Sequence, residues 1–414
     1  MNVRIQKSTA NGRIVAPPSK SYTHRLLVCA ALANGESMVE NVSLSDDIRA
    51  TIDCLRALGA RIDCVDSPFP QTVRVQGVGG KVRVKDDLYC RESGSTLRFL
   101  LPLSLLALTN TPDCDNVVLH GTQRLIERGV GVYEQAFTNA SFIKESTPKQ
   151  SALHIRGTIS GGNYVVRGDV SSQFITGLLF TLPLLPNGGN VTILPPFESA
   201  SYVDVTLHAL NEFGIVVHRL DETHFSVEGK QTYTPNNATV EGDWSNAAFL
   251  YALSYLGGSV DVYGVDKNSA QGDKVCLDVF RALSVGKGTA DLSNCPDLAP
   301  VLFAFAAAKH GALFTGTCRL KIKESDRAAA MREELSKFGV EVLLTDDTAE
   351  IIAPKTLHAP TQPLFSHNDH RIAMALTLLC SLTGGEITNA EAVKKSYPSF
   401  YDDLSALGIA VETF

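Results

Sequence analysis

The chain repeats a pattern in which a short polar segment leads directly into a stretch of nearly continuous apolar residues. Six such stretches occur, and most begin about 70 residues after the one before. Because a helix that is apolar on every side must be buried, each stretch predicts a helix inside a core. The predicted helix bodies are residues 24–33, 96–108, 174–185, 246–256, 298–308 and 371–382.

A second, amphipathic helix follows most of these stretches, and several of these helices end in an apolar residue followed by glycine. Glycine suits the left-handed backbone conformation that closes a helix. An alternating run of apolar and polar residues follows each pair, for example at 215–218 and 340–344, and predicts a strand. The pairs are Leu58-Gly59, Phe213-Gly214, Phe338-Gly339 and Leu407-Gly408.

The polar openings of the six buried helices carry most of the candidate functional residues. Six buried helices cannot share one small core, so we expect two groups of three. If the helices of a group run parallel, their N-termini converge on one face, where free N–H groups attract anions. Serine and aspartate there could act only as helix caps, but capping does not explain the lysine, arginine, glutamine and histidine beside them. The openings are Lys20-Ser21, residues 92–95, Ser171-Ser172-Gln173, Asp243, Asp297 and Asp369-His370-Arg371.

The composition is that of a folded globular protein, with 414 residues of which 44% are hydrophobic and 20% charged. The length favours two or three domains. A net charge of −7 argues against a general nucleic-acid binder, although it leaves room for a local basic pocket. The nine cysteines are scattered and form no Cys-x-x-Cys pair, which indicates reduced thiols and neither a disulfide framework nor a zinc site.

No targeting segment or membrane span is predicted. The N-terminus lacks a hydrophobic targeting core. The most apolar stretches are interrupted by proline or glycine and fall short of the roughly 18 residues that suggest a span. We therefore expect a cytoplasmic protein that does not associate with membranes.

Three openings in the first half of the chain offer groups that bind anions. Lys20 and Arg25 lie about one helical turn apart, so together with helix N–H groups they could grip a phosphate. The alternative is a solvated basic helix start, and the glycine spacing of a Walker A loop is absent. Gly94 lets backbone approach a ligand closely, or it makes a tight turn. The Ser171-Ser172-Gln173 side chains suit a phosphate or a polyol.

Two charged segments in the second half are further candidates. Glu324 and Arg327 lie three residues apart in a dense charge run and could form a plain ion pair on a solvated helix face. Asn368-Asp369-His370-Arg371 enters a buried helix, which is costly unless these groups are paired with each other or with a ligand. Arg124 could pair with Glu127 at the surface, and Lys395 is a weak signal by itself.

Taken together and in order, these motifs resemble the 5-enolpyruvylshikimate-3-phosphate synthase (3-phosphoshikimate 1-carboxyvinyltransferase) family. The resemblance runs from about Gly12 to about Asp403, and the ordered combination is highly specific. The motifs are Pro18-Ser19-Lys20-Ser21 with His24-Arg25, Ser93-Gly94-Ser95-Thr96 with Arg98, Val170-Ser171-Ser172-Gln173-Phe174, Lys323-Glu324-Ser325-Asp326-Arg327 and Asn368-Asp369-His370-Arg371.

The resemblance implies the enolpyruvyl transferase fold, an α/β architecture of two similar domains. Each domain has three βαβαββ-type units with buried parallel helices and outward-facing sheets, an inside-out α/β barrel. The first domain would be discontinuous, comprising residues 1–18 and 241–414, and the second would comprise 19–240. Two chain crossings would form the hinge, and the active site would lie in the interdomain cleft, with domain closure over the substrate.

The resemblance also implies a reaction. The enzyme would transfer the carboxyvinyl (enolpyruvyl) group of phosphoenolpyruvate to the 5-hydroxyl of shikimate 3-phosphate and release phosphate, in the shikimate pathway to chorismate and aromatic amino acids. This reaction calls for two carboxyl groups in different environments and for many cations around anionic substrates. It requires no metal and no organic cofactor. We expect a monomer whose partners are these small-molecule substrates.

The family's residue roles carry over to matching positions. Asp297 would accept the proton of the attacking hydroxyl, Glu324 would protonate the methylene carbon, and Lys20 is the third expected catalytic residue. Shikimate 3-phosphate would be held by Lys20, Ser21, Arg25, Ser171, Ser172, Gln173, Ser199, Asp297 and Lys323. Phosphoenolpyruvate would be held by Lys20, Gly94, Arg124, Gln173, Arg327, Arg371 and Lys395.

Three positions depart from the family pattern. Glu92 stands where asparagine is usual, which places a carboxylate near an anionic substrate. Phe99 stands where some relatives have proline, and Arg319 where some have a neutral substrate-binding residue. Glu92 and Arg319 are therefore left out of the expected site, and no prediction of glyphosate sensitivity is made.

Two other functions remain open from the sequence. UDP-N-acetylglucosamine enolpyruvyl transferase has the same fold and donor and often uses a loop cysteine, but the surroundings of Cys114 do not match. A non-catalytic anion-binding protein on the same scaffold is the second alternative. The presence of both Asp297 and Glu324 argues against it, because binding anions does not call for carboxylates.

Overall fold

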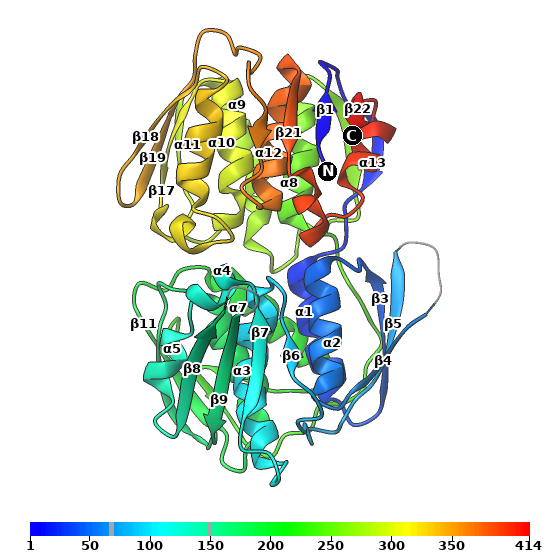
Figure 1. Cartoon of the computed structure of the whole chain (residues 1–414), viewed down its shortest axis with the longest axis vertical. Coiled ribbons are helices and arrows are strands. Elements are labelled where there is room, and N and C mark those ends of the chain that lie inside the picture. Colours follow the sequence, from blue (N-terminus) through cyan, green and yellow to red (C-terminus); the bar gives the residue numbers. More distant parts are fainter. Residues whose placement is uncertain (66–69, 148–150) are drawn as a thin grey trace. The chain divides into compact units, whose positions relative to one another are not determined.

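The computed structural model describes residues 1–65, 70–147 and 151–414, and these form two compact units (Figure 1). Unit 1 comprises residues 1–17 and 242–414, and unit 2 comprises residues 18–241. The chain therefore leaves unit 1 once, completes unit 2 without interruption, and returns. Both terminal strands belong to unit 1.

All six predicted buried helices are present, three in each unit, which confirms the predicted grouping. One boundary differs, because the apolar run that was expected to stay helical to residue 185 leaves the α-helix at Thr181. A 3₁₀ turn, η1 (Leu182–Leu184), follows, because Pro183 has no N–H to donate to an α-helical bond. The helices are α1 (Lys20–Leu32), α3 (Gly94–Thr109) and α6 (Ser172–Thr181) in unit 2, and α8 (Trp244–Tyr255), α10 (Ala299–Ala308) and α12 (His370–Thr383) in unit 1.

Among the described residues, five four-stranded sheets share one strand order, in which a parallel pair is followed by two antiparallel strands. The first sheet of unit 2 has the order β14 (Ala238–Thr239), β3 (Glu36–Val42), β5 (Gln71–Gln76) and β4 (Arg61–Val65). The second has the order β6 (Leu88–Tyr89), β7 (Val117–Gly121), β9 (Ser151–Gly157) and β8 (Ala140–Ser146). The third has the order β10 (Gly162–Arg167), β11 (Gly189–Leu194), β13 (His224–Val227) and β12 (His218–Arg219). One four-stranded sheet of unit 1 has the order β20 (Leu364–Phe365), β21 (Gly385–Thr388), β1 (Val3–Ile5) and β22 (Val411–Thr413). The other has the order β16 (Gly288–Asp291), β17 (Ala312–Thr315), β19 (Thr348–Ile352) and β18 (Glu341–Leu344). The sixth sheet is a parallel pair, β2 (Asn11–Val15) with β15 (Ser259–Tyr263).

The sheets lie outside the buried helices, as Figure 1 shows for each unit taken by itself. In β5, for example, Val73 and Val75 are fully buried while Arg74 between them is exposed. This alternation gives each sheet one face toward the helices and one toward solvent. The expected α/β fold of repeated βαβαββ units with interior helices is confirmed.

The amphipathic helices end at the predicted glycines, whose φ angles are +110°, +75°, +82° and +91° at Gly59, Gly214, Gly339 and Gly408. Strands follow three of the four glycines as predicted, with β4 after Gly59, β18 after Gly339 and β22 after Gly408. The run at 215–218 is mostly loop, since the Val216 N–H donates to the Gln231 side chain at 2.8 Å and not to a strand. These helices are α2 (Asp46–Ala57), α7 (Ala200–Glu212), α11 (Arg327–Ser336) and α13 (Phe400–Ala406).

Tyr133 links α3 and α6 near their N-terminal ends. It lies on α5 (Gly131–Ala136), and its hydroxyl is 2.8 Å from the Arg98 carbonyl oxygen and 2.9 Å from that of Phe174. Gly177 leaves the room for this hydroxyl, because a Cβ at that position would overlap it. The contact therefore sets the distance between two helix ends that carry candidate site residues.

The remaining elements are short or peripheral. No helix in the described part of the chain is long and apolar enough to cross a membrane. All nine cysteines are free thiols. The other helices are α4 (Gln123–Glu127), α9 (Cys276–Val285), and the 3₁₀ turns η2 (Gly272–Val275), η3 (Pro296–Leu298), η4 (Cys318–Ile322) and η5 (Ala390–Lys395).

Candidate active site

The three helix openings of unit 1 meet at the guanidinium group of Arg371. This arginine is the second residue of α12, and its Nη2 donates to Ser245 Oγ at 2.9 Å and to Asp297 Oδ2 at 3.0 Å. Ser245 lies in the first turn of α8, and Asp297 lies in η3, immediately before α10. The N-terminal ends of α8, α10 and α12 therefore converge, as the sequence predicted for helices of one group.

Arg327 is the most deeply buried cation of the charged cluster formed by Asp297, Lys323, Glu324, Arg327, Asp369 and Arg371, with 1% of its side chain exposed. It begins α11 and pairs with Asp297 at 2.8 Å, Glu324 at 2.7 Å and Asp369 at 2.8 Å. Burial by itself would lower the pKa of Arg327, but the three carboxylates outweigh it and raise the pKa well above its usual value. The guanidinium group is thus a permanent positive charge.

Asp297 differs from the other opening residues because its carboxylate caps no helix. Ser19, Ser93, Ser171, Asp243 and Asp369 each accept a backbone N–H at a helix start, as the capping alternative expected. Asp297 instead faces Lys323 at 3.3 Å, Arg327 at 2.8 Å and Arg371 at 3.0 Å. Burial would raise its pKa, but Arg371, Lys323 and Arg327 together hold the pKa well below its usual range. Asp297 is therefore ionised and surrounded by cations.

Lys323 has a pKa of about 8, which is low for a lysine. Burial is the main cause, and the charges of Arg319 and Arg327 add to it, although Asp297 and Glu324 act in the opposite direction. Arg319 is itself buried, on η4. This arginine was left out of the expected site because it departs from the family pattern, yet its charge acts on a site residue.

Lys395 connects to the cluster through the turn that precedes α12. Its Nζ donates to the Asn368 carbonyl oxygen at 2.6 Å, next to Asp369. Sequence reasoning did not include Asp369 among the site residues, although it had noted the motif. The signal that could have identified it was the cost of burying a carboxylate without a cation.

The openings of α3 and α6 meet in unit 2. Gln173, near the start of α6, accepts from Arg98 Nη1 at 2.6 Å and donates to Ser95 Oγ at 2.9 Å. A Cβ on Gly94 would lie 3.3 Å from both terminal nitrogens of Arg128 and 3.4 Å from Gln173 Oε1. The absent side chain at Gly94 therefore leaves a small space lined by a cation and an amide. Neither Arg98 nor Arg128 was among the expected site residues.

The α1 opening is tied to its neighbouring helices. Lys20 Nζ lies 2.9 Å from Asp47 Oδ2, on α2. Arg25 donates to the Ser21 carbonyl at 2.7 Å, to Thr206 Oγ1 at 2.8 Å and to the Tyr202 carbonyl at 2.9 Å. Burial lowers the pKa of Arg25 to about 10, which still leaves it charged at neutral pH.

The remaining expected residues in unit 2 are placed as follows. The Ser171 hydroxyl caps α6 by accepting from the Gln173 N–H at 3.3 Å, and Ser172 is buried beside it. Ser199 is buried at the start of α7 with a left-handed backbone (φ +56°). Arg124 lies on α4, where the Glu127 carboxylate accepts from Gln123 at 2.7 Å.

The departures from the family pattern have ordinary structural settings. Glu92 is half-buried one residue before the cap Ser93. Phe99 is buried in the core of unit 2, with its ring 6.3 Å from that of His24 and 5.6 Å from that of Phe180. Phe99 therefore joins α1, α3 and α6.

One cluster among the described residues has ligand atoms that could hold a metal ion: Glu333, Glu334 and His367, all within 4.8 Å of one another. Lys337 Nζ already donates to both Glu334 oxygens at 2.9 Å. A metal ion would have to displace this ammonium group.

Comparisons with known proteins agree with this fold. A family model described as EPSP synthase (3-phosphoshikimate 1-carboxyvinyltransferase) matches residues 5–404. A protein of that activity name from Clostridium kluyveri is 37% identical, with 98% of this chain and 97% of the relative covered. One from Clostridium acetobutylicum is 38% identical, with the same coverage. The EPSP synthase structure of Acinetobacter baumannii has a TM-score of 0.76 at 22% identity, with 99% of each chain covered.

The repeated units and the cation-rich helix openings define an α/β transferase with the enolpyruvyl transferase fold. Within that class the match extends over almost the whole chain and both Clostridium relatives carry one activity name. The chain belongs to the EPSP synthase family. The sequence-based family assignment is thereby confirmed.

Proposed function

We propose that this protein transfers the carboxyvinyl group of phosphoenolpyruvate to the 5-hydroxyl of shikimate 3-phosphate and releases phosphate. The observation that carries the proposal is the arrangement of Lys323, Arg327 and Arg371 around the ionised Asp297, beside Glu324. Cations of this density suit a donor with a phosphate and a carboxylate. The family match favours this reaction over transfer to UDP-N-acetylglucosamine.

The donor would be held by residues from both units. Arg327 and Arg371 would bind its anionic groups in unit 1, with Lys395 nearby. Lys20, Gly94, Arg124 and Gln173 would bind it from unit 2. Within this set, Gly94 lies beside Gln173, since a Cβ on Gly94 would be 3.4 Å from Gln173 Oε1. The acceptor would be held mainly by unit 2, through Lys20, Ser21, Arg25, Ser171, Ser172, Gln173 and Ser199, with Asp297 and Lys323 from unit 1.

The chemistry needs a base and an acid at different atoms. Asp297 would accept the proton as the 5-hydroxyl oxygen bonds to C2 of phosphoenolpyruvate, while Glu324 would protonate the methylene carbon C3. The product of this step is a tetrahedral intermediate. Loss of the proton from C3 and breakage of the C2–O bond to phosphate would then release phosphate and restore the double bond.

Substrate binding would make Asp297 a better base. In the structure, three cations hold its pKa well below the usual range. The anionic groups of the donor would compete for Arg327 and Arg371, so the pull of these cations on Asp297 would weaken. Its pKa would rise toward a value suited to proton transfer only when the donor is in place.

Units 1 and 2 are proposed to act as two domains that close over the substrates. The support is that the expected ligands are divided between residues 18–241 and the rest of the chain. Small-angle scattering with and without shikimate 3-phosphate measures this directly, and a decrease in the radius of gyration is expected. An unchanged radius of gyration at saturation would contradict closure.

The function is tested by a phosphate-release assay with both substrates. Phosphate should appear only when phosphoenolpyruvate and shikimate 3-phosphate are both present, and UDP-N-acetylglucosamine should not replace the acceptor. Binding of both substrates without release would instead support the non-catalytic alternative. We also propose a cytoplasmic monomer, supported by the nine free thiols for the location. Analytical ultracentrifugation tests the monomeric state.

A further inference from the structure

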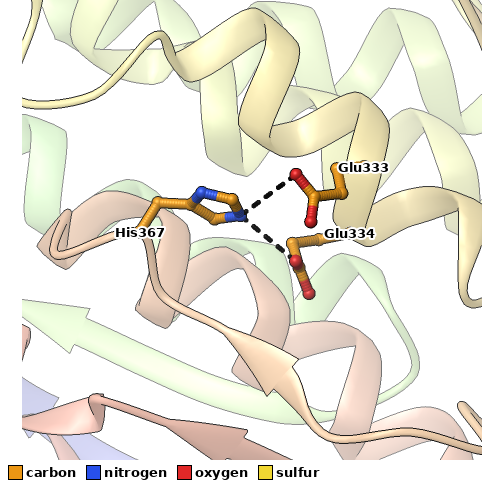
Figure 2. A group of neighbouring side chains, drawn as sticks. All are labelled: Glu333, Glu334 and His367. Atoms are coloured by element: carbon orange, nitrogen blue, oxygen red, sulfur yellow. Dashed lines mark hydrogen bonds and ion pairs between the residues drawn. The ribbon is translucent and has the colours of Figure 1, made fainter.

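Glu334 is a fully buried carboxylate on α11, the helix that begins with Arg327 of the charged cluster. Its oxygens accept from Lys337 Nζ at 2.9 Å and from the Phe365 backbone N–H at 3.0 Å. They also accept from His367 Nε2 at 3.1 Å (Figure 2). Burial by itself would raise the pKa of Glu334, but the hydrogen bonds from His367, Lys337 and Phe365 outweigh it and lower the pKa. The group is therefore a charged anchor with its hydrogen bonds satisfied.

The anchor is on the same helix as the central arginine of the cluster. Arg327 is the first residue of α11, and Glu334 follows seven residues later. Seven residues are close to two helical turns, so the two side chains leave the same face about 10 Å apart along the axis. Helix α11 thus holds Arg327 and Glu334 at a constant spacing.

Two partners of Glu334, Phe365 and His367, belong to β20 and to the segment that leads from it into α12. His367 and Asn368 both have left-handed backbones, with φ of +52° and +54°. Such conformations cost free energy in residues other than glycine and persist when surrounding contacts impose them. The bonds from Glu334 to Phe365 and His367 are contacts of this kind, and the Ser366 hydroxyl adds another by bonding to the Asn389 carbonyl at 2.8 Å.

This strained turn presents the groups that complete the cluster. The Asn368 carbonyl holds Lys395, the Asp369 carboxylate pairs with Arg327 at 2.8 Å, and Arg371 lies in the first turn of the helix that follows. Helix α11 therefore contacts the turn twice, through Arg327 at its start and through Glu334 two turns later. A segment held at both points cannot tilt relative to α11.

We propose that Glu334 is a positioning residue of the donor subsite, which acts by holding the turn at residues 364–369 so that Asp369 and Arg371 face Arg327. His367 is the second member of this contact. The kinetic consequence rests on the proposed function, whereas the effect on the turn does not.

The kinetic test compares Glu334→Gln with Glu333→Gln. Glu333 is the preceding residue, 64% exposed and 4.0 Å from His367, so it is a matched control that lacks the buried contacts. In Glu334→Gln, KM for phosphoenolpyruvate should rise about tenfold because the arginines are displaced, while kcat falls less and KM for shikimate 3-phosphate changes less than about twofold. The Glu333→Gln values should stay within about twofold of wild type for all three constants.

A second variant guards against misfolding of Glu334→Gln. In His367→Asn the side chain is too short to reach Glu334, yet asparagine tolerates the left-handed backbone and Glu334 keeps Lys337. We expect a smaller increase in KM for phosphoenolpyruvate, about threefold. If folded Glu334→Gln and His367→Asn both leave this KM within twofold, or change both substrates' KM equally, the positioning role is wrong.

Hydrogen exchange separates this inference from the proposed reaction. Without any substrate, amides of residues 364–371 should exchange at least about tenfold faster in Glu334→Gln than in wild type, and Glu333→Gln should match wild type. Unchanged protection in Glu334→Gln would overturn the inference even if the enzyme is active. Absence of phosphate release from the wild type would overturn the function and leave the exchange result valid.

Discussion

Replacing Asp297 by asparagine should separate catalysis from donor binding. The change keeps the size of the side chain and removes its charge and its ability to accept a proton. Asp297 lies within 3.3 Å of Lys323, Arg327 and Arg371. A simple binding residue would be expected to lose affinity when changed, whereas this carboxylate competes with the donor for the same cations.

The expected magnitude follows from the charges. Loss of a positioned general base costs about 10²–10⁴-fold in kcat, or about 3–5 kcal/mol in barrier height. Within the cluster, three cations face the carboxylates of Asp297, Glu324 and Asp369, so the change leaves one positive charge in excess. A charge-assisted hydrogen bond contributes about 1.5–3 kcal/mol. Donor affinity should therefore be unchanged or up to about tenfold tighter.

The assay pairs steady-state phosphate release with calorimetric titration of phosphoenolpyruvate in the presence of shikimate 3-phosphate. Asp278→Asn is the control, because Asp278 belongs to the same unit, is 76% exposed and pairs with a single arginine, Arg281. The reasoning fails if Asp297→Asn lowers kcat less than about tenfold. It also fails if donor affinity weakens in parallel with kcat, since that would make Asp297 a binding residue only.

Three further predictions follow from particular residues. Gly94→Ala should raise KM for phosphoenolpyruvate about tenfold and leave KM for shikimate 3-phosphate unchanged, because the new Cβ would crowd Arg128 and Gln173 at 3.3–3.4 Å. Equal effects on the two KM values would contradict this prediction. Lys323, which is proposed to bind shikimate 3-phosphate, has a pKa of about 8, so kcat/KM for shikimate 3-phosphate should fall as pH rises through 8. Lys323→Arg should flatten that limb of the pH profile, and a wild-type profile that is level from pH 7 to 9 would argue against the prediction. Tyr133→Phe should lower the melting temperature of the protein by about 2–5 °C, because the buried hydroxyl that bridges α3 and α6 is lost. Calorimetry measures this temperature, and an unchanged value would mean that the bridge is not needed for stability.

The buried helices could be predicted because their signal is local. A run that is apolar on every side, such as that of α10, has few other stable settings in a water-exposed protein. The helix ends could be predicted in the same way, because a glycine such as Gly339 adopts the left-handed backbone conformation that closes a helix. The strand at 215–218 was mispredicted because Gln231, fifteen residues away, takes the backbone bond of Val216.

The charged pairs of the site could not be read from the chain in the same way. Asp369 and Arg327 are 42 residues apart, and Lys20 and Asp47 are 27 apart, so only the folded structure brings them together. The motifs identified several of these residues, but they did not say which carboxylate meets which cation. The pairing of carboxylates with cations decides which groups are ionised, and only the contacts of the folded chain show this pairing.

The position of β1 delays the completion of its sheet while the chain is being synthesised. This strand lies between β21 and β22, so both of its neighbours are made long after it. Arg4 can pair with Glu386 only after Glu386, 382 residues later, has been made. At about 5–20 residues per second, synthesis of this stretch takes roughly 20–80 s. The continuous segment 18–241 can become compact during that interval. Until those neighbours are made, both edges of β1 are unpaired, and unpaired strand edges invite aggregation.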